Sequence, residues 1–391
     1  MDIIPLLKLM ADKKASDLFF SVGARVNIKL DGVCRPVNTP VLDAETTKTL
    51  AYALMNAAQI QAFEESFEMN FGYALENVGN FRVNVFRQRG ETAMVIRYIS
   101  GVIPDIEALG LPPLLKDMVM EKRGLILVVG ATGSGKSTTL ASMIDYRNSR
   151  KTGHILTIED PIEYVYQHKK SVVNQREVGL DTISFHNALV NAMREAPDMI
   201  LIGEIRDRDT MQHAMTYAQT GHLCLSTLHA NNSYHAMNRI INFFPFEARP
   251  SLLLDLSISL KCVISQRLAP GVDGKRLPAV EVLMNTTHIA ELIKDGKVDE
   301  IKEAMEKSLS PGSQTFEQAL YRLYADGKIS LDEAMRNADS PTNLSWLVNN
   351  APPDTLPASQ GNAQETANND LSTFTLNLNL DELEPHKDEP A

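Results

Sequence analysis

The sequence predicts an α/β protein with two domains of different kinds and an acidic tail. Its 391 residues exceed what one hydrophobic core usually supports. From Gly124 onward, short β-branched runs alternate with helical segments, a pattern typical of a mostly parallel sheet covered on both faces. We therefore expect an N-terminal α+β domain over 1–100, a linker over 101–122, a second domain over 123–350 and a disordered acidic tail over 351–391.

The first hundred residues carry alternating helix and strand patterns. Apolar residues at helical spacing predict a helix over 3–14, and a second helix is expected over 43–65. The segments SDLFFS and RVNIKLDG are typical of short strands. The alternating runs FRVNVFRQRG and ETAMVIRYI, joined around Arg89-Gly90, predict a hairpin.

Proline composition separates this domain from the next. Pro104, Pro112 and Pro113 disfavour regular structure, which places the linker there. Beyond it, strands are expected at LILVVG, HILTIED, DMILIGE and HLCLSTLHA. Residues 286–338 are expected to be helical, with a core of Leu292, Ile293, Ile301, Ala304, Leu320, Leu323 and Ala334.

Composition and charge exclude several classes of protein. The net charge is −11, and eight acidic residues against Lys387 after Ala351 account for −7 of it. This balance argues against nucleic-acid binding, which depends on clustered Lys and Arg. The three cysteines lack CxxC spacing, so neither a disulfide framework nor a zinc site is expected. Without a signal peptide or a transmembrane segment in the sequence, we expect a cytoplasmic protein.

A nucleotide-binding loop gives the strongest functional signal. The run Gly130, Ala131, Thr132, Gly133, Ser134, Gly135, Lys136, Ser137, Thr138 matches the GxxxxGK[ST] pattern between a predicted strand and a predicted helix. Backbone N–H groups of such a loop surround phosphate oxygens, and the helix N-terminus adds partial positive charge. We expect Lys136 to reach the β- and γ-phosphates of ATP and the Ser137 hydroxyl to bind Mg²⁺.

Acidic residues after two further strands predict hydrolysis. DMILIGE resembles a Walker B strand, but Gly203 stands where an aspartate is expected, so the acidic role falls on Glu204, which we assign to Mg²⁺, through water or directly. Glu159, Asp160 and Glu163 of ILTIEDPIEYVY are candidates for the base. Glu163 is our choice for orienting and deprotonating the attacking water, while Glu159 or Asp160 sharing this role stays open.

These motifs together resemble one family. The P-loop, the TIEDPIE acidic box, the GE-type Walker B and the histidine box TGHLCLSTLHAN are similar to those of the secretion and type IV pilus ATPases, over residues 1–345. The resemblance implies a RecA-like motor domain, a PAS-like first domain and a homo-hexameric ring. It also implies that His222 and His229 sense nucleotide and couple subunits, and that Arg82 and Arg97 approach the γ-phosphate when the domains close.

Within that family the chain looks closest to the PilU type of the retraction branch. The zinc-binding cysteines and extra N-terminal domain usual in assembly ATPases have no counterpart in this sequence. The resemblance implies a location at the inner-membrane base of the pilus, with a PilT-type retraction ATPase and an inner-membrane platform protein as partners.

Three other functions stay open at this stage. One is a structural or regulatory ring subunit with little turnover, although the complete set of Lys136, Ser137, Glu163 and Glu204 favours hydrolysis. Another is a pilus assembly or type II secretion ATPase. A nucleic-acid translocase is disfavoured because no basic, aromatic-interleaved stripe occurs.

Overall fold

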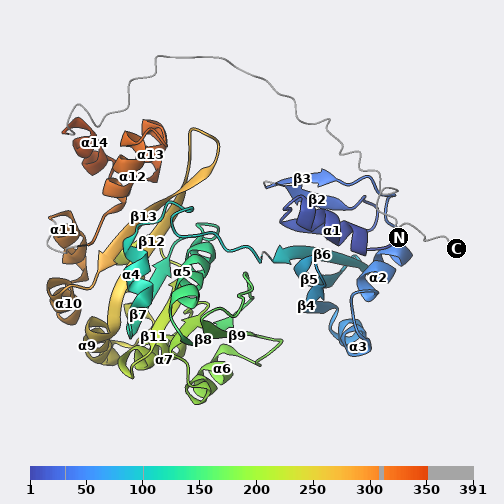
Figure 1. The fold of residues 1–391 in the computed structure, drawn as a ribbon, viewed down its shortest axis with the longest axis horizontal. Helices are drawn as coiled ribbons and strands as arrows, with labels where there is room; N and C mark the ends of the chain where they lie inside the picture. Colours follow the sequence, from blue (N-terminus) through green and yellow to red (C-terminus); the bar gives the residue numbers. More distant parts are fainter. Residues whose placement is uncertain (31, 100, 308–311, 351–391) are drawn as a thin grey trace. The chain divides into compact units, whose positions relative to one another are not determined.

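The computed structural model describes residues 1–30, 32–99, 101–307 and 312–350. The chain divides into two compact units, and the boundary falls between Gly101 and Val102 (Figure 1). Each unit has its own sheet, and helices accompany both sheets, so the mixed α/β composition predicted from the sequence is confirmed. The predicted tail, residues 351–391, lies outside the described residues.

The first unit is built on a six-stranded antiparallel sheet, in the order β3-β2-β1-β6-β5-β4. Its core forms where α1 and the two following helices bury apolar side chains against the central strands, Leu7, Leu50, Phe63 and Val83 among them. The elements are α1 (Ile4–Asp12), β1 (Asp17–Phe20), β2 (Asn27–Leu30), β3 (Val33–Pro36), α2 (Ala44–Tyr52), α3 (Ala57–Ser66), β4 (Glu68–Leu75), β5 (Gly79–Gln88) and β6 (Glu91–Ile99).

Most predicted elements of this unit are confirmed, and one is corrected. The first helix, the two short strands and the hairpin occur as expected. The single helix expected over 43–65 is wrong, because Asn56 adopts extended backbone angles and forms a capping box with Gln59, which begins a new helix. Strands β3 and β4 were not predicted. Three of the four residues in β3 and four of the eight in β4 are exposed, so the apolar alternation in both strands is weak.

The second unit contains a seven-stranded sheet in the order β13-β12-β7-β11-β10-β8-β9. Pairs from β12 to β9 are parallel, and β13 is antiparallel to β12. The strands are β7 (Gly124–Val129), β8 (Gly153–Glu159), β9 (Ser171–Glu177), β10 (Met199–Ile202), β11 (Leu223–Leu228), β12 (Leu260–Pro270) and β13 (Arg276–Met284). The α-helices are α4 (Leu114–Met120), α5 (Lys136–Arg150), α6 (Phe185–Ala192), α7 (Arg208–Gln219), α8 (Ser233–Asn242), α9 (Arg249–Ser259), α10 (Thr287–Lys294), α11 (Ile301–Glu306), α12 (Phe316–Ala325), α13 (Leu331–Asn337) and α14 (Pro341–Asn349). Short 3₁₀ turns occur at Met193–Glu195, Phe246–Ala248 and Val298–Glu300.

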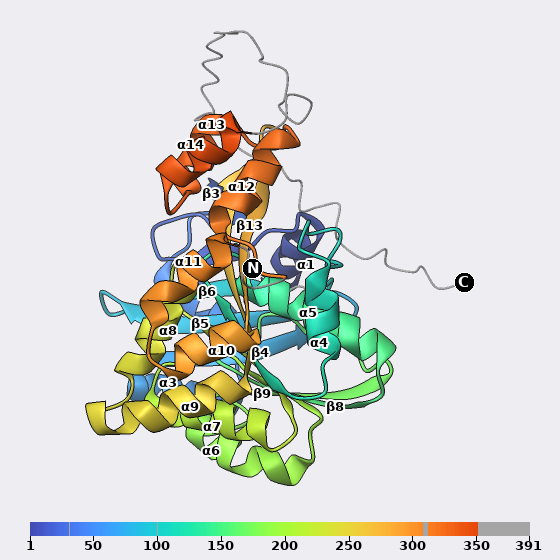
Figure 2. The same cartoon turned by 90° about the vertical axis from the view of Figure 1, so that its left-hand side faces the viewer.

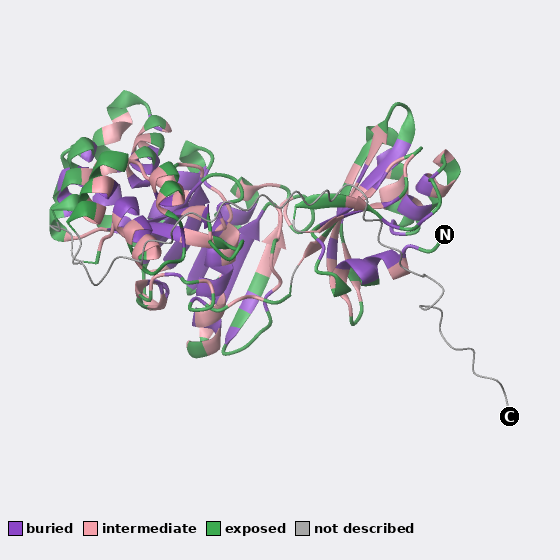
Figure 3. Cartoon of the chain, turned by 90° about the horizontal axis from the view of Figure 1, so that it is seen from above, coloured by how far each residue is buried: buried purple, intermediate pink, exposed green. Residues whose placement is uncertain are grey.

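Both faces of this sheet are covered, which explains the continuous apolar runs in its strands. In β7, Leu125 and Leu127 face a core built with α6 to α11, whereas Ile126 and Val128 face a core built with α4 and α5. Successive side chains of a strand point to opposite faces, so a strand buried on both faces needs apolar residues throughout. Figure 3 shows this burial along the central strands.

The residues predicted as a linker, 101–122, belong to the second unit from Val102 onward. Ile106, Leu115 and Val119 are buried in the core that faces α5. The tandem prolines stand immediately before α4, with Pro113 as its N-cap. At this end of a helix the missing N–H of proline costs nothing, so these prolines begin a helix instead of only interrupting structure.

The last three helices form a small cluster of their own. Figures 1 and 2 both show α12, α13 and α14 side by side beyond one end of the second unit's helical layers. Phe316, Leu320, Ala334 and Leu344 pack there on the projecting parts of β12 and β13. Of the core residues predicted for 286–338, all are buried except Leu323, which is partly buried against this cluster.

The β5–β6 turn offers a stability test. Arg89 and Gly90 have φ of 53° and 82°, both in the left-handed region that a type I′ hairpin turn requires. Arg89 is exposed, and asparagine tolerates this conformation better than arginine. Arg89→Asn should raise the free energy of unfolding by about 0.5 kcal/mol, and Gly90→Ala should lower it by about 1 kcal/mol. Urea denaturation of the full chain measures both, and equal effects of the two changes would contradict this account of the turn.

Candidate functional site

The glycine-rich loop after β7 has the shape of a phosphate cradle. Gly133 and Gly135 have φ of +78° and +89°. A Cβ atom on Gly130 would lie 2.4 Å from Ser134 Oγ and 2.6 Å from the backbone oxygen of Gln266. Helix α5 begins at Lys136 without a side chain capping its N-terminal N–H groups. The loop therefore leaves those N–H groups available to an anion.

Lys136 supplies a buried positive charge to this loop. Its side chain is 9% exposed, and its Nζ donates to the backbone oxygens of Gly130 (3.0 Å) and Ala131 (2.9 Å). Lys136 has no ion pair with any described residue, and burial lowers its pKa while Glu204 and Glu163 oppose that shift. The buried Ser134 hydroxyl also has no partner in the described structure. A buried cation beside an unpaired hydroxyl fits the phosphates of a nucleotide.

Ser137 and Glu163 are brought into direct contact. Ser137 Oγ donates to Glu163 Oε1 at 2.8 Å, although 26 residues separate them. The next residues along each segment are also paired, because the Thr138 hydroxyl and the Tyr164 hydroxyl lie 2.9 Å apart. Two contacts thus hold the segment after β8 against the first turn of α5. The carboxylate predicted to act as base lies beside the hydroxyl predicted to bind Mg²⁺.

Glu204 lies two residues after the end of β10, and its carboxylate contacts two further side chains of the site. Its Oε1 lies 3.2 Å from His229 Nε2, and its Oε2 accepts from Arg206 Nε at 2.8 Å. Arg206 also lies 3.7 Å from Asp160. Asp160 is thus part of the ionic network on this side of the loop.

The structure gives a steric reason for Gly203 in the Walker B position. Gly203 N donates to Ile158 O at 2.8 Å. A Cβ atom at residue 203 would lie 3.2 Å from both Glu159 Cα and Ile158 O, which are backbone atoms of a buried strand. An aspartate therefore does not fit here without movement of β8.

Glu159 closes β8 as a buried carboxyl group. It is 8% exposed and accepts hydrogen bonds from Thr157 Oγ1 (2.6 Å) and Gln175 Nε2 (3.2 Å). Burial raises its pKa to about 7, and the nearby negative charge of Glu163 contributes to the shift. Glu159 is therefore close to half protonated near neutral pH.

A cavity of about 560 Å³ adjoins the loop. Gly130, Ala131 and His229 line it, together with His235 and Arg239 of α8 and with Phe243 directly after that helix. Ala131, Thr132 and Gly133 are exposed at the rim of the loop.

Within this chain His222 lies away from the phosphate loop, and its assignment as a nucleotide-binding residue stays a prediction. It directly precedes β11, and its backbone oxygen accepts from Gly124 N at the start of β7. His229 directly follows the same strand. The six residues of β11 lie between the two histidines, so His222 and His229 stand at opposite ends of this strand, about 20 Å apart. His222 Nδ1 instead lies 3.2 Å from Thr220 Oγ1 and from Tyr217 O.

The two predicted arginines are neighbours in the first unit. Arg82 and Arg97 stand opposite each other on β5 and β6. Arg97 Nε donates to Asp17 Oδ1 at 2.9 Å, whereas Arg82 Nη1 has no hydrogen-bond partner among the described residues. Both arginines belong to the first unit, whereas the phosphate loop, Glu163 and Glu204 belong to the second.

Two residues of the site were not predicted from the sequence. Arg206 lies two positions after Glu204 in the sequence, and this short spacing could have indicated the contact between their side chains. Gln266 accepts from Thr139 Oγ1 at 2.6 Å and packs against Gly135, although 127 residues separate it from Thr139. No local pattern indicates such a contact.

In the described part of the chain, no cluster of three or more His, Cys, Asp or Glu side chains has the arrangement of a metal site. Mg²⁺ that arrives with a nucleotide needs only one or two protein ligands beside the phosphates, and Ser137 and Glu204 suit that demand. None of the helices in the described residues has both the length and the apolar character needed to cross a membrane.

Comparison with known proteins identifies the family. The pattern of the family described as "Type II/IV secretion system protein" matches residues 2–276. "Type IV pilus ATPase PilU" of Pseudomonas aeruginosa PAO1 is 48% identical over 349 residues, which cover 89% of this chain and 91% of that protein. "Type IV pilus retractation ATPase PilT" of the same organism is 43% identical over 344 residues, which cover 88% and 100%. The crystal structure of the pilus retraction motor PilT with bound ADP covers 88% of this chain and 99% of its own, with a TM-score of 0.83 and 43% identity.

The fold and the site define a P-loop nucleotide-binding protein. The chain belongs to the family of secretion and type IV pilus ATPases, and the resemblance drawn from its four motifs is confirmed.

Gly203 can be tested by adding one methyl group. Gly203→Ala should lower the free energy of unfolding by about 1–3 kcal/mol, because the new Cβ presses on the β8 backbone. Gly101→Ala is the matched control, since a Cβ there meets open space. Denaturant titration compares the two, and equal stability of both variants would contradict the steric account.

Glu159 predicts a pH dependence of stability. Its folded pKa of about 7 lies above the ordinary value of 4.5, so the folded state holds the proton more tightly than the unfolded chain. Its contribution to stability is therefore present below pH 4.5 and is lost as pH rises to about 7. Glu159→Gln removes this term, so the stability of the variant relative to wild type should increase from pH 5 to pH 8 by roughly 2 kcal/mol. A difference that stays constant over this range in urea titrations would refute the shifted pKa.

Proposed function

We propose that this chain is a Mg-ATP-hydrolysing motor subunit that powers type IV pilus retraction, as the PilU-type accessory to a PilT-type motor. The contact between Ser137 and Glu163, beside the buried Lys136, is the observation that carries this proposal. This contact places a carboxylate that can accept a proton from an attacking water next to a phosphate-binding loop. The two Pseudomonas relatives, whose names state pilus and ATPase roles, supply the biological setting.

The proposed roles follow from position and chemistry. Residues 130–135 and Lys136 bind the phosphates, while Ser137 holds Mg²⁺ directly and Glu204 holds it through water. Bound Mg²⁺ would offset negative charge on the phosphate oxygens. Glu163 orients the water and accepts its proton.

Further residues are proposed to complete the site. His229, paired with Glu204, links nucleotide state to the loop after β11. Arg82 and Arg97 are proposed to supply permanent positive charge from the first domain, a role that suits the planar guanidinium.

The assembly is proposed on the same family relationship. The chain forms a homo-hexamer on the cytoplasmic side of the inner membrane, at the pilus base, and contacts a PilT-type ATPase and an inner-membrane platform protein. Residues 123–350 are proposed to form a RecA-like motor domain, onto which the residues from Val102 to 122 pack, preceded by a PAS-like domain over 1–100. The segment 351–391 is proposed as an acidic, disordered tail, in keeping with its composition.

Steady-state ATPase activity tests the catalytic assignment. Glu163→Gln should lower kcat about 10²–10⁴-fold while MgATP affinity stays within about threefold, because the amide cannot accept the proton but the phosphate loop is intact. Lys136→Ala should instead lose nucleotide binding itself. Equilibrium binding of a fluorescent ATP analogue separates the two variants. Full turnover by Glu163→Gln would remove Glu163 from its role.

The biological assignment needs the partner and the cell. Purified wild-type chain is assayed alone and with a PilT-type ATPase, and retraction is scored by twitching of cells that carry wild type or Lys136→Ala. The proposal expects ATP turnover and loss of accessory retraction in the variant. Absence of turnover, with no rise in partner activity, would favour a regulatory ring subunit.

A further inference from the structure

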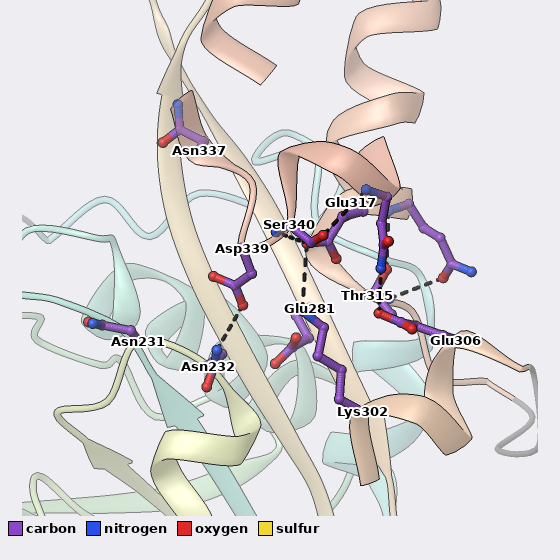
Figure 4. A network of polar contacts seen from close by, with 12 residues as sticks. Asn231, Asn232, Glu281, Lys302, Glu306, Thr315, Glu317, Asn337, Asp339 and Ser340 are labelled. Carbon is purple, nitrogen blue, oxygen red and sulfur yellow. Dashed lines mark hydrogen bonds and ion pairs between the residues drawn. The ribbon is translucent and has the colours of Figure 1, made fainter. Parts of the chain in front are cut away.

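A polar network joins the loop after β11 to the C-terminal helices (Figure 4). Asn232 Nδ2 donates to Asp339 Oδ2 at 2.7 Å, and Arg267 donates to the other oxygen of the same carboxylate. Arg267 also donates to Asn337 O (2.5 Å) and to Asn231 O (3.2 Å). We call Arg267, Asp339 and Asn232 the C-terminal clamp.

The clamp is partly shielded from solvent. Asn232 is 9% exposed, the side chains of Asp339 and Arg267 are 17% and 22% exposed, and the Arg267 guanidinium lies 4.0 Å from the centre of the Phe316 ring. Directly beside it, the buried carboxylate of Glu281 accepts from Ser233 N (2.8 Å) and Ser265 Oγ (2.9 Å). The first turn of α8 is thus held from β12, from β13 and from the α13–α14 connection. Polar contacts of this kind lose more on truncation than exposed ones.

Strand β12 connects this clamp to the phosphate loop. Successive side chains alternate between the faces of a strand, so Gln266 points opposite to Ser265 and Arg267. Gln266 bonds Thr139 of α5 and contacts Gly135. On the other face of the strand, Ser265 donates to Glu281 and Arg267 donates to the backbone oxygen of Asn231. One short stretch of strand therefore fixes both loops that border the site.

The loop held by the clamp begins with His229, whose Nε2 lies 3.2 Å from Glu204. Only Ala230 and Asn231 separate His229 from Asn232. The clamp touches neither Lys136, Ser137 nor Glu163, whose own contacts come from the loop after β7 and the segment after β8. Two routes therefore lead from the clamp to the site: one along β12 through Gln266 to the phosphate loop, and one through the loop after β11 to His229 and Glu204. The proposal concerns the second route.

We propose that Asp339 and Arg267 are positioning residues for ATP hydrolysis, which hold the loop after β11 so that His229 stays against Glu204. Through them the C-terminal helices α12–α14 control turnover without contributing a group to the reaction. The inference rests on the ATPase function proposed above. It assigns a role in turnover to the α13–α14 connection, which lies outside every motif used to recognise the site.

Steady-state kinetics of Asp339→Ala tests the proposal in the full chain. We expect kcat to fall about tenfold while KM for ATP and the Kd for MgADP stay within about twofold, because a displaced loop impairs turnover and leaves the phosphate loop intact. Asn343→Ala is the matched control, since it removes a polar contact of α14 with Glu306 away from the clamp. Its kcat should equal that of wild type.

A double variant identifies the route of the effect. If Asp339 acts through His229, then His229→Ala and His229→Ala/Asp339→Ala should have the same kcat within about twofold. Multiplicative losses in the double variant, or equal losses in kcat and nucleotide affinity, would overturn the proposal. A change of less than twofold in Asp339→Ala would do so as well.

Hydrogen exchange gives a readout that does not need turnover. The N–H groups of Ser233 and His235 bond to Glu281 and to Asn232, so Asp339→Ala should accelerate exchange in the peptide that carries them by about tenfold or more. Wild-type activity tests the ATPase function separately. An inactive wild type with faster exchange in the variant would refute the ATPase function and leave only the structural clamp, whereas an active wild type with unchanged exchange would refute the clamp.

Discussion

The parallel register of four neighbouring strands is the constraint on which this molecule depends. In the order β7-β11-β10-β8, each strand ends at the same edge of the sheet. These ends deliver the phosphate loop, His229, Glu204 and Glu159 in turn. Because both faces of the strands are packed with apolar side chains, a slip of one residue would exchange the two cores. The apolar packing therefore determines which side chains stand at the edge of the sheet where the four strands end.

The sequence predicted the parts of the site that lie close to a strand end. The phosphate loop and His229 follow a buried strand directly, Glu204 follows one by two residues and Glu163 by four, so the local pattern located them. The histidine motif did not show that its two histidines lie apart: His222 precedes β11 and His229 follows it, so the strand separates them in space, and the role of His222 stays a prediction. Gln266 and Asp339 were not predicted because their contacts join segments far apart in the chain. The fold itself was largely predictable, and its misses, such as the break at Asn56, arose from capping rather than from apolar spacing.

The helices α12–α14 show how a remote cluster is connected to a reaction centre. Their apolar packing involves mainly the outer parts of β12 and β13, near Ala269 and Ala279. The shorter path toward the site is polar and passes through Arg267 and Asp339. Apolar contacts tolerate small sliding, whereas hydrogen bonds of fixed geometry do not. The cluster is thus held mainly by apolar packing and is linked to the loop after β11 by hydrogen bonds.

The close approach of Gly203 to β8 also couples the residues that follow β10 to the acidic segment that follows β8. A carboxylate at residue 203 requires the backbone of Ile158 and Glu159 to retreat, so a single substitution would disturb the acidic segment before it supplied a useful ligand. The positions of Glu159 and Glu204 therefore depend on each other through a backbone contact between β8 and residue 203 that glycine leaves undisturbed.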